Sequence, residues 1–321
     1  MPEVYVAFWS VDRLFIYWDR GFAGAVWRDF QKGSDDLSGM YRDRLINMKK
    51  IRLTIQLLFT ILTNGYVYGF LNGKIYQGKL KYVCVPGLNC YSCPGAVSSC
   101  PIGALQALLN QRGFAVPFGA LGFLFIFGSL LGRFVCGWLC PFGMVQDLLH
   151  KIPIFRKRKR LPFHHVLKYG KYAVLVLLVG IGSMFLFDGF AKVPAFCKFL
   201  CPSGTLFGAL PLLGTNKLLR GQAGNLFFWK AGVLFFLLLL SVKIYRPFCQ
   251  YLCPLGAIYG WFNRFSLLRI HWEKEQCTLC GACQRACPAG LLAKEISVSP
   301  ECIRCGKCVE ACPAKCLRIG K

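Results

Sequence analysis

Charged side chains are scarce in this chain, and acidic side chains are the scarcest of them. Only 17% of the 321 residues are charged, with 14 acidic residues against 39 basic ones, whereas 55% are hydrophobic. Soluble domains carry about 25% charged residues. The mean hydropathy of +0.46 therefore indicates an integral membrane protein. The basic excess lies largely in short loops beside apolar segments, which argues for membrane topology and against a nucleic-acid partner.

Histidine is also rare, and the usual signatures of catalysis are missing. None of the four histidines lies inside a clearly apolar run and no CxxCH sequence is present, so an intramembrane bis-histidine haem is not expected. No GxGxxG follows a strand, no P-loop occurs, and no acid–base pair stands out. The 19 cysteines do not suggest a disulfide framework, because such frameworks belong to small secreted domains. We therefore expect no catalytic residue and no reductase activity in this chain itself.

Four apolar runs are long enough, or nearly so, to cross a bilayer core of ~30 Å, which takes about 20 helical residues. They cover residues 51–71, 114–131, 172–190 and 226–245. Lys and Arg precede the first run and fill the loop between the second and the third, and such an excess marks cytoplasmic loops. We predict a multi-pass protein of the cytoplasmic membrane, in contact with lipid, with both termini in the cytoplasm.

The chain divides into three predicted parts. Residues 1–47 contain no apolar span, no cysteine and no cleavable signal pattern, and Met48 followed by two lysines resembles a natural start. This segment is therefore an N-terminal extension or a wrongly assigned start. Residues 48–265 form the predicted membrane domain, and residues 266–321 form a cysteine-rich C-terminal domain.

The membrane domain repeats its own sequence. Residues 133–143 (RFVCGWLCPFG) follow the second apolar run, and residues 246–256 (RPFCQYLCPLG) follow the fourth. CPIG at residues 100–103 and CPSG at residues 201–204 follow the first and third runs in the same manner. The predicted fold is an α-helical integral membrane protein with about four transmembrane helices in two two-helix repeats, followed by a C-terminal α+β domain.

The strongest chemical signal is a doubled cysteine run in the C-terminal domain, in which three cysteines at intervals of three positions precede a fourth that is followed by proline. Its members are Cys277, Cys280, Cys283, Cys287, Cys302, Cys305, Cys308 and Cys312. In such a run three thiolates hold one cubane and the fourth reaches the neighbouring cluster. We expect Cys312 to join the first three ligands and Cys287 to join the second three. Paired zinc sites are the alternative, but they rarely show this doubled run.

A second pattern, CxxxCP, occurs three times in the membrane domain. The pairs are Cys136 with Cys140, Cys197 with Cys201, and Cys249 with Cys253. Positions i and i+4 share one face of a helix, so each pair can offer two thiolates to one metal centre. The first and third pairs lie at equivalent ends of predicted spans, and together they predict one further cluster site near the C-terminal domain. Buried packing cysteines are the alternative.

The remaining thiols of the membrane domain are expected on its opposite side. They are Cys84, Cys90, Cys93 and Cys100, together with the pair Cys197 and Cys201. The first four alone, or some of them with the pair, suffice for one cluster. An outward-facing disulfide is the competing interpretation. In all, we expect two [4Fe-4S] clusters in the C-terminal domain and one or two more in the membrane domain.

From about residue 48 onward, the chain resembles the membrane-bound polyferredoxins related to the NapH-type quinol-oxidising subunit and to the membrane core of NosR. The CxxxCP pairs and the terminal doubled run, which is that of two-cluster ferredoxins, carry this resemblance. It implies an electron-transfer subunit that passes electrons between a cytoplasmic redox protein and quinone or an extracytoplasmic partner. The thiols on the opposite side depart from the family pattern and leave donor, acceptor and direction open. The alternative function is a redox or maturation factor for a metalloenzyme.

Overall fold

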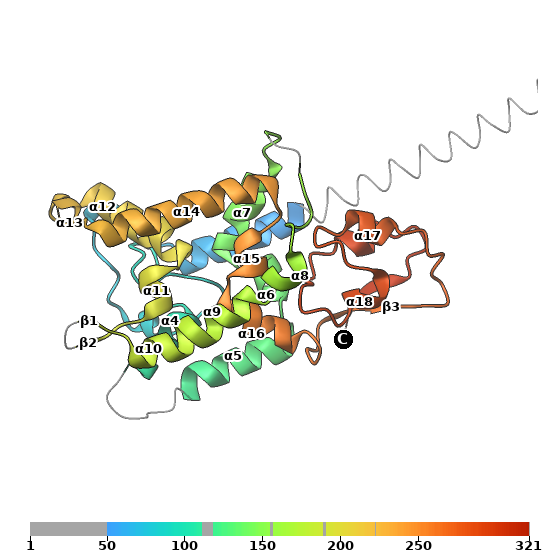
Figure 1. Ribbon diagram of the computed structural model, residues 1–321, viewed down its shortest axis with the longest axis horizontal. Helices are drawn as coiled ribbons and strands as arrows, with labels where there is room; N and C mark the ends of the chain where they lie inside the picture. Colours follow the sequence, from blue (N-terminus) through green and yellow to red (C-terminus); the bar gives the residue numbers. More distant parts are fainter. Residues whose placement is uncertain (1–49, 111–117, 155–156, 189–190, 222, 321) are drawn as a thin grey trace, which may run out of the picture. The chain divides into compact units, whose positions relative to one another are not determined.

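The computed structural model describes residues 50–110, 118–154, 157–188, 191–221 and 223–320 (Figure 1). The predicted N-terminal extension and the first residues of the second predicted span lie outside the described residues. Everything reported below belongs to one compact unit, Met48–Lys321.

Helices make up most of the chain before residue 265. Residues 50–63 are helical. The helices that follow are α3 (Val67–Asn72), α4 (Pro101–Leu109), α5 (Phe118–Leu131), α6 (Phe134–Trp138), α7 (Pro141–Lys151), α8 (His164–Leu167), α9 (Gly170–Val174), α10 (Gly182–Phe185), α11 (Ala195–Phe199), α12 (Leu210–Thr215), α13 (Lys217–Gly221), α14 (Asn225–Lys243), α15 (Pro247–Tyr251) and α16 (Pro254–Phe262). Figure 1 shows α14 running beside α7, and α5 beside α16.

Shorter elements connect these helices. A 3₁₀ turn covers Lys79–Tyr82, and two π-helical stretches, Leu175–Ile181 and Gly204–Ala209, continue neighbouring helices. Two two-residue strands, β1 (Phe187–Asp188) and β2 (Ala191–Lys192), pair antiparallel.

Two helical segments of the described chain are long and apolar enough to cross a membrane. They are His164–Phe185 and Asn225–Lys243, and they overlap the third and fourth predicted spans. Only 22% of each apolar window is buried inside the protein, which suits a surface that faces lipid better than it suits a core helix. The second predicted span is described as a shorter apolar helix, Gly119–Leu131. In the first, the helix ends at residue 63, and α3 begins at Val67.

The CPxG motifs start helices. Cys100, Cys140 and Cys253 are the N-cap residues of α4, α7 and α16, and each is followed by proline at the first helical position, where a backbone N–H is not needed. The glycine three residues after the cysteine turns its N–H to the sulfur, as Gly256 does to Cys253 Sγ at 3.3 Å. The motif therefore holds a thiol at a helix N-terminus with a backbone donor beside it.

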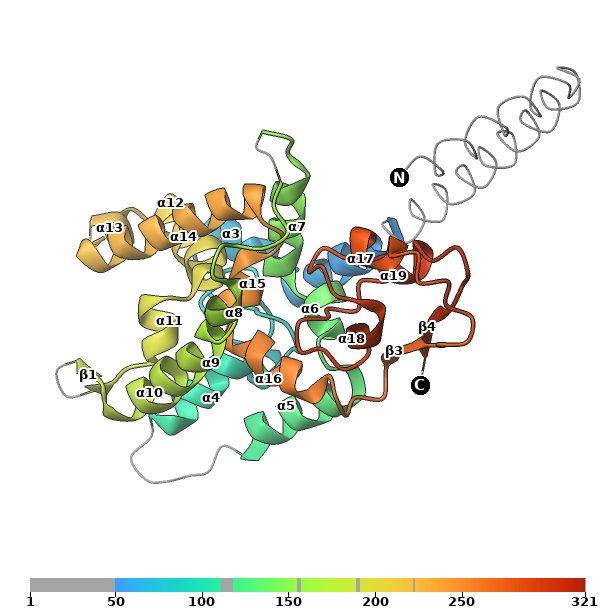
Figure 2. The same cartoon turned by 45° about the vertical axis from the view of Figure 1, so that its right-hand side comes forward.

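The C-terminal domain contains a two-stranded sheet and three short helices. Strand β3 (Arg269–Trp272) pairs antiparallel with β4 (Leu317–Gly320), next to the C-terminus in Figure 2. The helices are α17 (Ala282–Ala286), α18 (Ala293–Ile296) and α19 (Lys307–Glu310). The two cysteine runs repeat the same unusual backbone turn, because the residue before the second cysteine is left-handed in both, with φ of 53° at Leu279 and 52° at Arg304.

Candidate metal centres

The four thiols of the first predicted ligand set line one pocket in the C-terminal domain. Cys277, Cys280 and Cys283 come from the first run and Cys312 comes from the end of the second. A fifth thiol, Cys316, lines the same pocket, with its Sγ 3.3 Å from that of Cys312. The sequence pattern left Cys316 outside the predicted ligands, and the structure packs it in the core of the domain beside them.

This pocket has a polar feature that suits a sulfur-rich cofactor. Trp272 lines it, and the buried Nε1 of Trp272 has no acceptor at hydrogen-bond geometry among the described residues, although the Cys277 thiol lies close to it. No three His, Cys, Asp or Glu side chains in the described ranges converge on a single-ion site. A cubane does not require such convergence, since each thiolate binds a different iron. The donor set therefore fits an iron–sulfur cluster.

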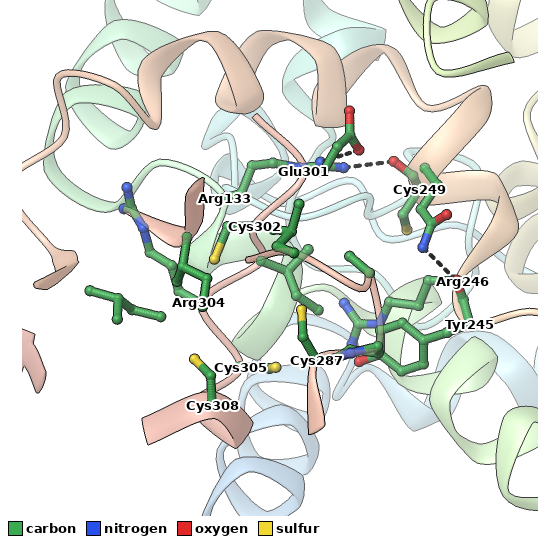
Figure 3. Close-up of a pocket in the computed structure, with 17 residues that line it drawn as sticks. Arg133, Tyr245, Arg246, Cys249, Cys287, Glu301, Cys302, Arg304, Cys305 and Cys308 are labelled. Atoms are coloured by element: carbon green, nitrogen blue, oxygen red, sulfur yellow. Dashed lines mark hydrogen bonds and ion pairs between the residues drawn. The ribbon is translucent and has the colours of Figure 1, made fainter. Parts of the chain in front are cut away.

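The second predicted set lines another pocket, which both parts of the chain enclose. Cys287, Cys302, Cys305 and Cys308 come from the C-terminal domain, while Cys249 comes from the helical module before residue 265. Figure 3 shows the four sulfurs of the set grouped on one side of the pocket, with Cys249 on the other. The pocket of the second predicted ligand set is therefore lined in part by a cysteine of the predicted site in the membrane domain.

Cys136, Cys140, Cys249 and Cys253 form one group in the core of the helical module. None of them is more than 5% exposed. Burial raises the pKa of the Cys253 thiol, and the charges of Cys249, Cys136 and Cys140 raise this pKa further, so the other three thiols lie within electrostatic reach. Thiols in such a site ionise readily only when a metal binds them.

Two buried arginines tie this group together by reciprocal contacts. Arg133 precedes Cys136 by three residues and donates from Nη2 to the backbone oxygen of Cys249 at 2.7 Å. Arg246 precedes Cys249 by three residues and donates from Nη1 to the backbone oxygen of Cys136. Each is at most 1% exposed. Their charges lie next to the four thiols, where they offset the negative charge that thiolates around an iron–sulfur core carry.

Each of these arginines has an acidic partner. Arg246 Nε donates to Asp147 at 2.7 Å, and Arg133 Nη1 pairs with Glu301 at 3.1 Å. Glu301 also accepts from the fully buried Lys171. Burial acts to raise the pKa of Glu301, but the charges of Arg133 and Lys171 outweigh it and hold this pKa below its ordinary value. Glu301 directly precedes Cys302, so this ion-pair network joins the module to the second ligand set.

The C-terminal domain contacts the helical module through its second cysteine run. Asn263 Nδ2 donates to the Cys302 oxygen at 2.8 Å, and Trp138 Nε1 donates to the Arg304 oxygen at 3.0 Å. Gly137, between the cysteines of the first CxxxCP pair, has no room for a Cβ because the Ile303 oxygen occupies that position. Backbone therefore packs on backbone between Cys136 and Cys302.

The basic loop before α8 holds the other face of the same domain. Lys159 Nζ donates to the oxygens of Gln284 and Arg285 at 2.9 and 2.8 Å. Arg160 donates from Nε to the Ala289 oxygen at 3.0 Å and from Nη2 to the Gly290 oxygen at 3.1 Å. The charge pattern predicts that the basic loop and the C-terminal domain both lie in the cytoplasm. These contacts agree with a common side for the two.

The six thiols expected on the opposite side separate into two kinds. Cys100 and Cys197 pack against the core of the module beside Cys201. Cys90 Sγ lies close to Cys201 Sγ, since a Cβ built on Gly204 would be 3.6 Å from the former and 3.8 Å from the latter. The other two thiols lie at the edge of this group. Cys84 Sγ faces Ser99 Oγ at 3.8 Å, and Cys93 is buried in the loop of Cys90, whose backbone oxygen accepts from the Cys93 N–H at 3.0 Å. All 19 cysteines are free, so the described chain contains no disulfide.

Sequence analysis missed the polar residues around the thiols. Gln146 Nε2 donates to Cys249 Sγ at 3.2 Å, and Gln106 Nε2 donates to Cys197 Sγ at 3.3 Å. Each glutamine stands six residues after a CPxG cysteine, and each arginine stands three residues before a CxxxCP cysteine. These equal spacings in the sequence could have identified the two glutamines and the two arginines as residues of the thiol sites.

Family models match the same segments. A model described as a 4Fe-4S binding domain matches residues 98–121, 112–162, 172–218 and 225–275, which together cover about half of the chain. A 4Fe-4S dicluster domain matches residues 269–313. The chain belongs to the 4Fe-4S ferredoxin-type family. It is a polyferredoxin, because the matched domains repeat along its length.

Named relatives bear out the expected resemblance to NapH and NosR. The methylamine utilization ferredoxin-type protein MauN of Methylobacillus flagellatus is 28% identical over 257 residues, 78% of this polyferredoxin and 78% of MauN. Regulatory protein NosR of Stutzerimonas stutzeri is 32% identical over 170 residues, 49% of this chain and 20% of NosR. Ferredoxin-type protein NapH of Haemophilus influenzae is 29% identical over 169 residues, 51% of this chain and 50% of NapH. No solved structure matches the polyferredoxin.

Proposed function

We propose that this polyferredoxin is an electron-transfer protein of the cytoplasmic membrane, in which cluster sites stand in series from the C-terminal domain into the membrane module. A [4Fe-4S] cluster, when bound, takes up and releases single electrons. The observation that carries the proposal is the pocket shared by Cys249 with Cys302, Cys305 and Cys308. A residue of one proposed site, Cys249, lines the pocket of the next.

Three ligand sets follow from this arrangement. The first is Cys277, Cys280, Cys283 and Cys312; the second is Cys287, Cys302, Cys305 and Cys308; the third is Cys136, Cys140, Cys249 and Cys253. Their support is that each set lines one pocket or lies in one core. The third set has two buried arginines against its backbone and so is prepared for negative charge.

The proposed architecture comprises about four spans in two related two-helix units, with residues 48–265 as the membrane domain and 266–321 as the ferredoxin domain. The reciprocal arginine contacts and the equally placed glutamines support an internal duplication. The contacts of Lys159 and Arg160 support a cytoplasmic ferredoxin domain, because the basic loop and the domain must lie on one side.

We propose that the first ligand set is the end that meets a soluble redox protein. Cys280 is exposed, and the neighbouring Leu279 is 81% exposed. An exposed apolar residue beside an exposed ligand suits transient docking of a redox protein whose own cofactor lies near its surface. Quinone or an extracytoplasmic redox protein is the proposed partner at the membrane end, in line with the ferredoxin-type names of the relatives.

Iron and acid-labile sulfide, measured on anaerobically purified protein together with EPR during stepwise reduction, test this proposal. We expect iron for at least three cubanes. Cys136→Ser is expected to remove about four iron atoms, the content of one cubane, while the signals of the C-terminal clusters persist. Cys84→Ser is the matched control and should leave the iron content unchanged. Iron for only two cubanes in the wild-type protein would contradict the third site and the series arrangement.

A further inference from the structure

Cys90, Cys100, Cys197 and Cys201 meet around one point of the helical module. A Cβ on Gly204 would lie within 4 Å of the sulfurs of Cys90 and Cys201. Burial raises the pKa of the Cys197 thiol, and the charges of Cys201, Cys100 and Cys90 raise this pKa further. Burial likewise raises the pKa of Cys100, to which the charges of Cys201 and Cys90 add, and the pKa of Cys201, to which the charge of Cys90 adds, so all four thiols lie within electrostatic reach of one another. They come from three separate segments of the chain, and the fold alone brings them together.

The local geometry repeats that of the third ligand set. Gln106 donates to Cys197 Sγ and accepts from the Phe196 N–H at 3.0 Å. Gln146 donates to Cys249 Sγ and accepts from the Phe248 N–H at 3.3 Å. The same amide thus bridges the same two backbone positions at both places. Both glutamines are 0% exposed, and burying an amide costs free energy unless its donors and acceptors are hydrogen-bonded. A cysteine that only packs does not require such a donor beside its sulfur.

The glycine amides of the CPxG motifs repeat as well. Gly204 N donates to Cys201 Sγ at 3.4 Å, as Gly256 N does to Cys253 Sγ at 3.3 Å. Backbone donors of this kind stabilise a thiolate at a helix N-terminus and do little for a neutral thiol.

Positive charge also lies close to the four thiols. Lys230 Nζ donates to the Cys197 oxygen at 3.2 Å. Lys81, which is 2% exposed, donates to the Ala96 oxygen at 2.6 Å, and its charge reaches Cys93 and Cys90. Buried or half-buried lysines are retained where negative charge balances them. They take the place that the two arginines have in the third set.

We propose that Cys90, Cys100, Cys197 and Cys201 bind a fourth iron–sulfur cluster, of the cubane class, and that Cys84 and Cys93 are not ligands. The donor chemistry is four thiolates, which suits iron and sulfide and excludes hard cations. The site adds to the proposed function but has its own contacts, so it stands or falls separately from the third set.

The loop 87–90 joins this site to the third set. A Cβ built on Gly87 would lie 3.3 Å from Cys140 Cα, and Cys90 follows three residues later. Three residues of chain span at most about 11 Å, so the two groups of thiols are neighbours and not opposite ends of a bilayer. Tyr259, which donates to the Pro86 oxygen at 3.2 Å, is buried beside the start of this loop.

The test compares ligand and control variants of the full-length protein purified without oxygen. Wild-type protein is expected to hold iron for four cubanes, counted by iron and sulfide analysis and by Mössbauer spectroscopy of ⁵⁷Fe-grown cells. Cys197→Ser and Cys201→Ser should each lose about four iron atoms. Cys93→Ser and Cys84→Ser, substitutions in the same region, should lose none. The EPR signals of the C-terminal clusters report whether each variant is folded.

Three results would overturn the assignment. Wild-type protein with iron for three cubanes, one of which is lost in Cys136→Ser, excludes the fourth site. Retention of all iron in Cys197→Ser and Cys201→Ser makes these thiols packing residues. Loss of iron in Cys93→Ser, with retention in Cys197→Ser, assigns the cluster to the segment that holds Cys84 to Cys100. Loss of the Cys136-dependent iron alone concerns the third set and leaves this site intact.

Discussion

At the scale of single residues, the two glutamines aimed at sulfur are the most direct means of adjusting a bound cluster. A donor to a ligand sulfur stabilises the reduced, more negative state of a cluster. Gln146→Leu keeps the volume and removes the donor, so it should lower the reduction potential of the third site. One hydrogen bond of about 1 kcal/mol corresponds to about 40 mV for one electron.

EPR-monitored redox titration measures this shift, and Gln106→Leu supplies the matched variant. It should shift a different signal by a similar amount and leave the Cys136-dependent signal in place. If both substitutions moved the same signal, the two glutamines could not serve separate centres.

Glu301 is the second residue with a sharply defined role. It is the acidic partner of both Arg133 and Lys171, neither of which has measurable exposure. Glu301→Gln removes the carboxylate that pairs with both buried cations, and breaking a buried pair in this way costs about 3–5 kcal/mol. We expect a lower free energy of unfolding, measured by denaturant titration in detergent. Glu295→Gln, at an exposed site in the same domain, is the control and should change stability by less than about 0.5 kcal/mol.

At the scale of elements, the turn of the first CxxxCP pair determines how closely the ferredoxin domain docks. Gly137→Ala places a methyl group against the Ile303 oxygen, and the two backbones must separate. Overpacking of this kind costs about 1–3 kcal/mol. Hydrogen exchange should quicken in the second cysteine run, and the magnetic coupling between neighbouring reduced clusters should weaken. Gly232→Ala, in a helix with open space around it, should change neither. Unchanged exchange in Gly137→Ala would mean that the contact is not tight.

The elements also mark what sequence could and could not predict. Which C-terminal thiols share a pocket was predictable, because the doubled spacing of the cysteines groups them in this way. The apolar runs located α14 and the helix that ends at Phe185, but not the start of the latter at His164, since its first turns carry histidine and lysine and do not extend the apolar run. Which four of the six remaining thiols meet could not be predicted, because Cys90 and Cys93 differ only in the path of one loop.

At the scale of the whole molecule, the basic loop before α8 holds the ferredoxin domain against the helical module by hydrogen bonds. Lys159→Ala combined with Arg160→Ala removes four hydrogen bonds to backbone oxygens. Partly exposed bonds of this kind sum to about 1–3 kcal/mol. Hydrogen exchange over residues 284–290 should accelerate, while the iron content stays constant. Lys157→Ala in the same loop is the control. If hydrogen exchange were equal in the double variant and in Lys157→Ala, the basic loop would not contribute to the docking of the ferredoxin domain.

The same contact requires that the basic loop and the C-terminal domain lie on one side of the membrane in the proposed topology. Protease added to inside-out vesicles should cleave both the basic loop and the C-terminal domain, and right-side-out vesicles should protect both. Immunodetection of a C-terminal tag and of fragments cut after residue 157 reads the two sites together. Cleavage of one site without the other would contradict their common side.

The reciprocal contact between the two arginine motifs has a consequence for ancestry. Arg133 meets Cys249, and Arg246 meets Cys136, so residue i of one half contacts residue j of the other, and j contacts i. This is the contact pattern of an isologous twofold interface. A chain of half this length, with one such motif, could satisfy its arginine only against a second copy of itself. The reciprocal contact is therefore the arrangement that the proposed internal duplication would leave if it joined two half-length chains that had paired as a homodimer.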